Sequence, residues 1–341
     1  MTELQNSLEN REGVTSRIML HFFRHGSKVS AEDMPDHETP LSDRGRLQAM
    51  AHAANENFPQ SVAFGSPRLR TQQTAALVMG GDLDTITGNE SLDELREKLN
   101  KGKRMGNTIL ADPRLDIHYP DTEEYDDRYY GDNEGGFLKF LFEESDELAE
   151  QLNDRQADTY SRMASQIADL VMKYLNIAPR WDQLVRESKK YSDTMERFLS
   201  THAGKGAAFL GKIVELTRGM GARDELAQAL NMEAFEPLEG FNVEIVSRGR
   251  QNQEVRVVYH KKEGDNPPSN TNITDSNIIK KIANNFCIPW NLFLPSVVVV
   301  LNFTIPDPFN NCNTIEAVTI GPIPNEIIEP KLAPSIIDNC S

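Results

Sequence analysis

Two short strand-like runs in this chain end in a histidine, and they constrain its fold more than any other feature. Residues 17–23 contain no glycine or proline and lead directly into Arg24 and His25. Residues 196–201 lead in the same way into His202. Runs of this kind predict buried strands. Because ligands of open α/β sheets bind at the carboxyl ends of the strands, both histidines are expected at one site there.

Predicted helices and strands alternate through the first 265 residues. The sequence predicts helices over about 43–57, 67–80, 137–152, 159–175 and 204–218, and further strands over 62–65, 241–248 and 254–260. A long helical insertion, about residues 98–190, separates two of the predicted strands. This alternation predicts an α/β domain over residues 1–265, a three-layer α/β/α sandwich with a mainly parallel central sheet and with the insertion above the active site.

The composition changes near Gly264. Residues 266–341 hold ten of the 18 prolines, 13 asparagines and only nine charged residues, without a helical period. We interpret them as a C-terminal extension of unknown role, a poorly ordered tail or a small β appendage. Residues 296–303 are strand-like, and the prolines and asparagine just before them leave the apolar stretch too short for a good membrane span.

The overall charge bounds the classes of partner. The 341 residues carry a formal net charge of −16, with a pI near 4.9, which disfavours binding to nucleic acids or anionic membranes. Residues 1–13 are polar and show no secretory signal, and the three cysteines lack metal-ligand spacing. A cytoplasmic location is therefore expected. A few clustered arginines can still make a local anion site on an acidic chain.

A third segment, residues 66–75, adds arginines to the two histidines. Its sequence is Ser-Pro-Arg-Leu-Arg-Thr-Gln-Gln-Thr-Ala, with Arg68 and Arg70 two residues apart. Guanidinium groups bind phosphate oxygens through paired planar donors. A neutral imidazole is a nucleophile that can attack phosphorus. The three segments together predict a site that transfers a phosphoryl group to a histidine.

Four motifs, in the same order, resemble the histidine phosphatase superfamily. They are Arg-His-Gly at 24–26, Leu-Ser-Asp-Arg-Gly-Arg-Leu-Gln-Ala at 41–49, the 66–75 segment, and Thr-His-Ala-Gly at 201–204. The superfamily contains cofactor-dependent phosphoglycerate mutases, fructose-2,6-bisphosphatases and phosphohistidine phosphatases. One Arg-His-Gly is a weak signal, but four elements in order are specific. The resemblance covers about residues 17–260, without the insertion.

The resemblance implies a role for each matching residue. His25 is expected to be the nucleophile, which requires a neutral ring with one nitrogen held by an acceptor. Arg24 and Arg70 are expected to clamp the phosphoryl oxygens. Arg68 competes with Arg70, but the family arginine stands four residues after the serine, which selects Arg70. His202 is expected to be protonated for part of the time and to donate to the same oxygens.

Further binding groups surround these four. Gly26 is expected to let the backbone approach the phosphate, and the amide of Ala203 to donate to it at a strand-to-helix turn. Lys28 could add a cation. The arginines and His202 supply the charge that a metal would bring, so neither metal nor cofactor is predicted.

The group that protonates the leaving oxygen is expected to be a carboxyl. The family commonly carries a glutamate in a Leu-x-Glu context about 20 or more residues after the second arginine. Glu97 fits that context, although the glycine after it comes one residue late. Glu94 is the alternative, and either could simply be a charge on a helix surface.

The residues after the first histidine depart from the mutase pattern. Residues 27–31, Ser-Lys-Val-Ser-Ala, stand where mutases carry a glutamate and an asparagine that bind sugar acids. The departure favours a phosphomonoester hydrolase over a mutase-type phosphotransferase. A non-catalytic phosphate-binding or scaffold protein is the third alternative. The expected partner is a phosphorylated small molecule or phosphoprotein; the natural substrate and the oligomeric state are not predicted.

Overall fold

The computed structural model describes residues 15–30, 34–52, 61–80, 86–100, 109–118, 120–131, 133, 135–188, 190–247, 253–263 and 266–273. Within these residues seven strands form one sheet in the order β3-β2-β4-β1-β5-β6-β7. The strands are β1 (Ser16–Arg24), β2 (Val62–Gly65), β3 (Ile109–Ala111), β4 (Thr194–Thr201), β5 (Gly240–Ser247), β6 (Gln253–Glu263) and β7 (Asn266–Ile273). Of these seven, β5 and β7 run against the other five, so the predicted mainly parallel sheet is confirmed.

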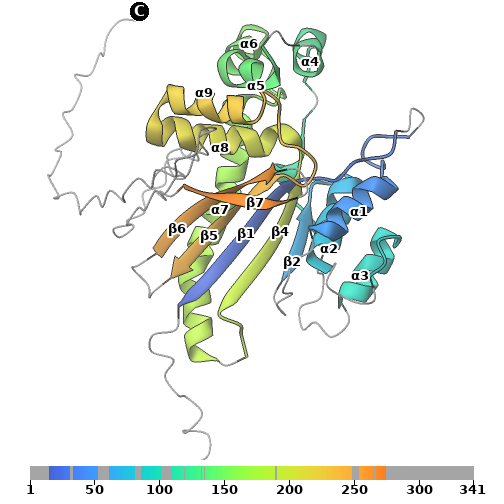
Figure 1. Ribbon diagram of the computed structural model, residues 1–341, viewed down its shortest axis with the longest axis vertical. Helices are drawn as coiled ribbons and strands as arrows, with labels where there is room; N and C mark the ends of the chain where they lie inside the picture. The colour runs from blue at the N-terminus through green and yellow to red at the C-terminus, as the bar shows by residue number, and fades with distance from the viewer. Residues whose placement is uncertain are drawn as a thin grey trace, which may run out of the picture.

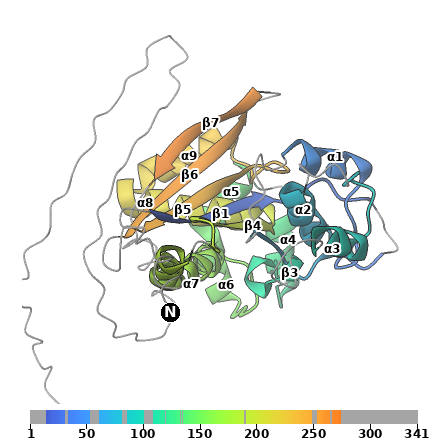
Figure 2. The ribbon, with the colours of Figure 1, turned by 90° about the horizontal axis from the view of Figure 1, so that it is seen from below.

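Helices cover both faces of the sheet, as the sandwich prediction requires (Figures 1 and 2). The helices α7 (Tyr160–Glu187) and α8 (Ala203–Arg218) pack on one face with β1 and β5. The helix α2 (Leu69–Gly80) packs on β2 and β4 and carries α1 (Asp43–Ala51) and α3 (Leu92–Asn100) on its outer side. The helix α9 (Met220–Ala229) packs on α8. The chain therefore has the predicted three-layer α/β/α architecture.

The predicted insertion, residues 98–190, divides into two parts with different places in the fold. Its middle holds the short helices η1 (Pro113–Leu115), α4 (Glu123–Tyr130), α5 (Phe137–Lys139), η2 (Phe140–Glu144) and α6 (Ser145–Gln151). Figure 1 shows α4, α5 and α6 grouped at one end of the molecule. Its flanks are not insertions, because β3 is an edge strand of the sheet and α7 is a layer of the sandwich. Residues 98–190 are therefore not an insertion throughout: the middle is, whereas the two flanks belong to the sandwich.

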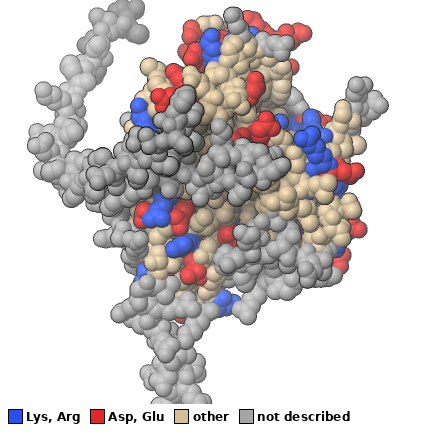
Figure 3. Space-filling model, viewed as in Figure 1, with Lys and Arg blue, Asp and Glu red and all other residues tan. Residues whose placement is uncertain are grey.

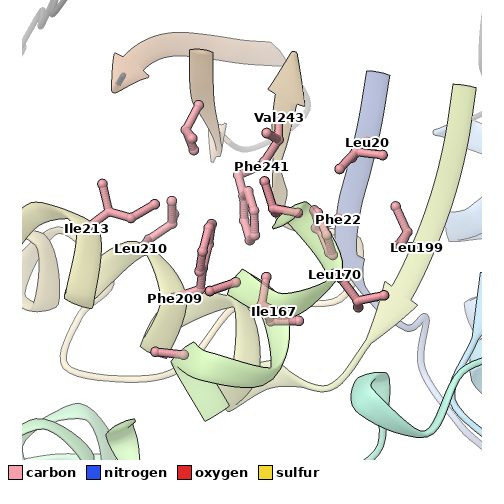
Figure 4. Close-up of a cluster of buried hydrophobic side chains, with 14 of the residues drawn as sticks. Leu20, Phe22, Ile167, Leu170, Leu199, Phe209, Leu210, Ile213, Phe241 and Val243 are labelled. Carbon is pink, nitrogen blue, oxygen red and sulfur yellow. The ribbon is translucent and has the colours of Figure 1, made fainter. Parts of the chain in front are cut away.

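Aromatic rings stack among aliphatic side chains in the core between the sheet and the α7–α8 layer (Figure 4). Phe241 on β5 is 1% exposed, and its ring stacks on those of Phe22 and Phe209, with centroids 4.9 and 5.3 Å away. Phe22 lies on β1, two residues before the first site arginine. Packing at Phe241 therefore supports the strand that carries the site.

Replacing Phe241 by alanine should destabilise the domain strongly. Truncation of a buried phenylalanine removes apolar contacts and leaves a cavity, so Phe241→Ala should lower the free energy of unfolding by about 3–5 kcal/mol. Urea denaturation followed by circular dichroism measures this change. The exposed Met220, in contrast, should tolerate alanine with a change below about 0.5 kcal/mol. Equal losses in the two variants would contradict this account of the core.

The predicted end of the domain and the predicted C-terminal strand lie near or beyond the last described residue, Ile273. The sheet continues past residue 265, because β7 pairs antiparallel with β6, so the predicted end of the domain is too early. The strand predicted over 296–303 lies outside the described residues, and the role of 274–341 stays a prediction. The helix expected over 43–57 is α1, which ends at Ala51.

Among the described residues no helix has both the length and the apolar character that a membrane span needs.

Candidate active site

The register of the parallel strands brings the two histidines together. Arg24 lies opposite Thr201 in the β1–β4 ladder, and the next residue of each strand is a histidine. The amide of His25 donates to the carbonyl of Thr201 at 3.0 Å. The rings of His25 and His202 meet edge to face, with centroids 5.2 Å apart. Ser66, just after β2, reaches the same point, with its Oγ 3.2 Å from His202 Nε2.

The remaining motif residues hold the backbone that follows the first histidine. Thr74 on α2 accepts from the Gly26 amide at 3.2 Å, and Gln48 on α1 accepts from the Ser27 amide at 3.1 Å. Gly45 allows this close contact, because a Cβ there would lie 2.0 Å from the carbonyl oxygen of Ser27. The threonine, glutamine and glycine of the motifs thus fix the position of the Gly26 loop rather than touch a ligand.

The hydrogen bonds of His25 set its tautomer. Its Nδ1 is 2.7 Å from the carbonyl oxygen of Gly26, which can only accept, so Nδ1 carries the proton. Its Nε2 accepts from Arg70 Nε at 3.3 Å. Burial, with His202 and the arginines adding to it, lowers the pKa of His25 well below its usual value. The ring is therefore neutral at neutral pH, with the lone pair of Nε2 on the arginine side.

Burial acts on His202 too, and the expected partial protonation of its ring stays a prediction for the phosphate-bound site. Its Nε2 lies 3.4 Å from Asp116 Oδ1. Burial lowers the pKa of His202 to about 4, with Arg70 and Arg68 acting in the same direction, although the bond to Asp116 opposes the shift. Sequence reasoning missed this because neither the depth of burial nor the nearby arginines could be read from the chain. A bound phosphate dianion would raise the pKa of His202 again.

The two clamp arginines differ in what they already bind. Arg24 donates through Nη1 to the carbonyl of Phe235, and its buried Nε has no hydrogen-bond partner among the described residues. Arg70 is 3% exposed, and its Nη1 and Nη2 donate to the backbone oxygen and Oδ2 of Asp36 at 2.6 and 3.0 Å. Arg24 therefore keeps one buried donor without a partner among the described residues, whereas both Nη atoms of Arg70 are already bound to Asp36.

Asp36 is a site residue that the sequence did not indicate. Its carboxylate binds Arg70, Arg68 and the ammonium of Lys28, the last at 3.0 Å. The hydrogen bonds from Arg70 and Lys28 outweigh the effect of burial and hold the pKa of Asp36 far below its usual range. No motif covers the loop on which it lies, so no signal in the single sequence could have selected it.

Arg68 contacts carboxylates rather than the pocket. Its Nε donates to Asp116 Oδ1 at 2.6 Å, and its Nη2 donates to the carbonyl of Ile117 at 3.1 Å. It is absent from the residues that line the pocket beside His25, whereas Arg70 lines it. The geometry therefore agrees with the choice of Arg70 as the candidate clamp.

One pocket of about 580 Å³ contains most of the predicted site. Seven of the eight predicted residues line it, namely Arg24, His25, Gly26, Lys28, Arg70, His202 and Ala203. Residues of the α4–α5 region and of 233–237 complete its walls, among them Tyr129, Tyr130, Phe137, Glu233 and Glu236. The structure brings these side chains together, and their roles remain predictions.

Glu97, the predicted acid, is not brought to the pocket. It is exposed on α3 and does not line the pocket. Glu94 is also exposed, and its carboxylate accepts from the amide and hydroxyl of Ser91 at 2.7 and 2.8 Å, at the start of the helix. Asp116 is the carboxyl in contact with His202. It follows η1 directly, in a segment that was expected to be part of the insertion, so the sequence did not indicate it.

No group of three or more histidine, cysteine or acidic side chains could hold a metal ion within the described residues.

The low pKa values of the two histidines predict how stability depends on pH. An unfolded histidine binds its proton near pH 6.5, whereas folded His202 does so near pH 4. Below pH 6.5 the unfolded state therefore binds more protons, and stability falls as the pH falls. The loss between pH 6.5 and 4.5 should be about 2 kcal/mol for His202 alone. Urea denaturation at both pH values should show a smaller loss in His202→Asn, and equal losses would contradict the shift.

The model of the histidine phosphatase superfamily (branch 1) matches residues 20–229. No curated protein matches the chain significantly. Three solved structures are similar: mycobacterial hydrolase 1 (16% identity, 68% of this chain, 92% of that chain, TM-score 0.37), mycobacterial glucosyl-3-phosphoglycerate phosphatase with VO3 (14%, 67%, 92%, 0.34) and a putative alpha-ribazole-5'-P phosphatase of Escherichia coli (16%, 73%, 99%, 0.34).

Proposed function

Because this chain belongs to the histidine phosphatase superfamily (branch 1), we propose that it is a phosphomonoester hydrolase that forms a phosphohistidine on His25. The observation that carries the proposal is the state of His25. Its Nδ1 donates to the carbonyl of Gly26, and its Nε2 lone pair lies beside Arg70 in a pocket that also holds Arg24 and His202. A buried, neutral and oriented imidazole next to anion-binding groups is what covalent capture of a phosphoryl group requires.

The reaction divides into two in-line displacements. In the first, Nε2 of His25 forms a bond to phosphorus while the bond from phosphorus to the leaving oxygen breaks, and that oxygen takes a proton. In the second, water attacks phosphorus, the N–P bond breaks and phosphate leaves. The carbonyl of Gly26 accepts from Nδ1 throughout and so stabilises the positive charge on the phosphorylated ring.

The clamp acts on charge that spreads over the phosphoryl oxygens in each transition state. Arg24 and Arg70 both line the pocket, and Arg70 lies against the attacking nitrogen. The N-terminus of α8 begins at Ala203, directly after His202, and helix N-termini favour anions. Fixed donors of this kind stabilise a transition state without reorganisation.

We propose that Asp116 positions His202 and does not itself supply the proton. Its carboxylate is 3.4 Å from His202 Nε2 and 2.6 Å from Arg68 Nε, and these bonds outweigh burial and hold the pKa of Asp116 far below its usual range. Asp116→Asn should therefore slow the hydrolysis of an alkyl phosphate and of p-nitrophenyl phosphate, whose leaving group needs little protonation, by factors that agree within about threefold. Slowing of the alkyl ester at least about tenfold more would show instead that Asp116 supplies the proton.

Two assays separate hydrolysis from the alternative functions. Release of p-nitrophenolate from p-nitrophenyl phosphate, dependent on His25, supports an enzyme over a scaffold protein. Incubation of 3-phosphoglycerate with a bisphosphate primer tests mutase activity. The proposal predicts free phosphate in the first assay and no phosphoglycerate isomer in the second. Isomer formation at a rate comparable with hydrolysis would assign the chain to phosphotransfer instead.

A further inference from the structure

Aromatic side chains form one wall of the pocket. Tyr129 and Tyr130 come from α4 and Phe137 from α5. The ring of Tyr129 meets those of Tyr130 and Phe137 edge to face, with centroids 4.9 and 5.3 Å apart. The hydroxyl of Tyr129 lies only 3.2 Å from the position that a Cβ on Gly204 would take. The aromatic wall therefore begins two residues from His202 and extends outward from it.

An acidic segment forms a second wall. Glu233 and Glu236 line the pocket, and both side chains are exposed. The segment that carries them is fixed to the site, because Arg24 donates to the carbonyl of Phe235 and the amide of Leu238 donates to the carbonyl of Arg24 at 3.0 Å. The backbone of the segment that carries the two carboxylates is thus held beside the pocket by Arg24.

The charges beyond the phosphate clamp are predominantly negative. Lys28 is the cation that lines the pocket outside the clamp in the described part of the chain, and it pairs with Asp36 at 3.0 Å. Acidic side chains also gather over α4 and α6, at the top of Figure 3. A groove there is lined by Glu123, Glu124, Asp127, Glu144 and Glu147, together with Arg128. The field at this end of the molecule attracts cations and repels a second anion.

We propose that the mouth of the pocket binds a positively charged group, so that the substrate is a phosphate ester with a cationic body. This inference rests on the proposed phosphatase function of the site. Aromatic faces and carboxylates are the two groups that proteins use to hold organic ammonium ions. The arginines bind the phosphate, and the aromatic and acidic side chains at the mouth of the pocket bind the positive charge of the same molecule. An ester with a second acidic group, such as a phosphorylated carboxylic acid, meets the carboxylates of Glu233 and Glu236 instead.

The experiment compares two phosphate esters as inhibitors of one reaction. The group beyond the phosphate is a cation in the first ester and an anion in the second. Phosphocholine and 3-phosphoglycerate compete with p-nitrophenyl phosphate, and their inhibition constants are measured at low salt. Phosphocholine should bind at least about tenfold more tightly than 3-phosphoglycerate. Glu233→Gln should reduce the ratio of the two inhibition constants about threefold, and the double variant Glu233→Gln with Glu236→Gln should reduce it about tenfold. The single variant matters because the charge of Glu236 also acts on Arg24.

The controls keep the specificity separate from the catalytic function. Glu225→Gln removes an equal charge from an exposed position on α9 and should leave the ratio unchanged. Raising the salt concentration to about 1 M should shrink the ratio in the wild type, because exposed charges are screened. Tighter binding of 3-phosphoglycerate, or a ratio that the Glu233 variants do not alter, would overturn the inference. If p-nitrophenyl phosphate hydrolysis itself does not depend on His25, the proposed function fails instead.

Discussion

His25→Ala is expected to lose hydrolysis of p-nitrophenyl phosphate by a factor on the order of 10⁴ or more. The reason is that the covalent step needs a lone pair at the position of Nε2. The neighbouring His202 cannot supply it, because its own Nε2 lies between Ser66 and Asp116. The expected loss is in kcat, with a smaller change in KM, since the arginines that bind phosphate remain.

A matched histidine variant controls for the fold. His52 is exposed at the end of α1, so His52→Ala should keep full activity. Circular dichroism and the melting temperature should show that His25→Ala is folded. Turnover in His25→Ala within a factor of about ten of wild type would contradict the assignment of the nucleophile, since uncatalysed attack by water does not reach such a rate.

Arg70→Ala is expected to give the second largest loss, about 10²- to 10³-fold in kcat/KM. Arg70 contacts the nucleophile through Nε and presents its guanidinium to the same pocket, so its removal weakens both the orientation of His25 and the binding of phosphoryl oxygens. Arg24 and the N-terminus of α8 remain, which is why a trace of activity should persist. Arg70→Lys should recover little, because an ammonium cannot donate from two planar nitrogens.

Arg96→Ala is the control for the loss of one arginine charge. Arg96 is half-buried on α3, pairs with Asp93 at 2.8 Å and does not line the pocket. Its activity should stay within about twofold of wild type. The inhibition constant for inorganic phosphate should rise in Arg70→Ala and stay constant in Arg96→Ala. Unchanged phosphate inhibition in Arg70→Ala would show that this arginine is not part of the clamp.

The strands and the four motifs could be predicted because their signals are local. The apolar run before Arg24 has the composition of a buried strand. Because this run and the one before His202 both end in a histidine, and ligands bind at the carboxyl ends of strands, β1 and β4 were expected to run in the same direction. The family pattern, in which the arginine stands four residues after the serine, selected Arg70 over Arg68 without any structure. These predictions needed only residue types, their order and the motifs of the superfamily.

The acids could not be predicted because their roles depend on contacts between distant segments. Asp36 binds Arg70 across the site from a loop without a motif, and Asp116 reaches His202 from the residue directly after η1. Glu97 was chosen on local context alone, and its helix turns it away from the pocket to solvent. The pKa of His202 could not be predicted for the same reason, since it is set by burial and by arginines far away in sequence.

The most direct test of the proposed mechanism is to trap the phosphorylated enzyme. Wild-type protein is mixed briefly with a phosphate ester labelled on phosphorus, quenched with base and digested. The account predicts one labelled peptide containing His25, stable to base and labile to acid, as expected for a phosphoramidate. The label should be absent from His25→Ala and present in His52→Ala. Turnover by the wild type without any such adduct, or a label on a residue other than His25, would contradict the central claim.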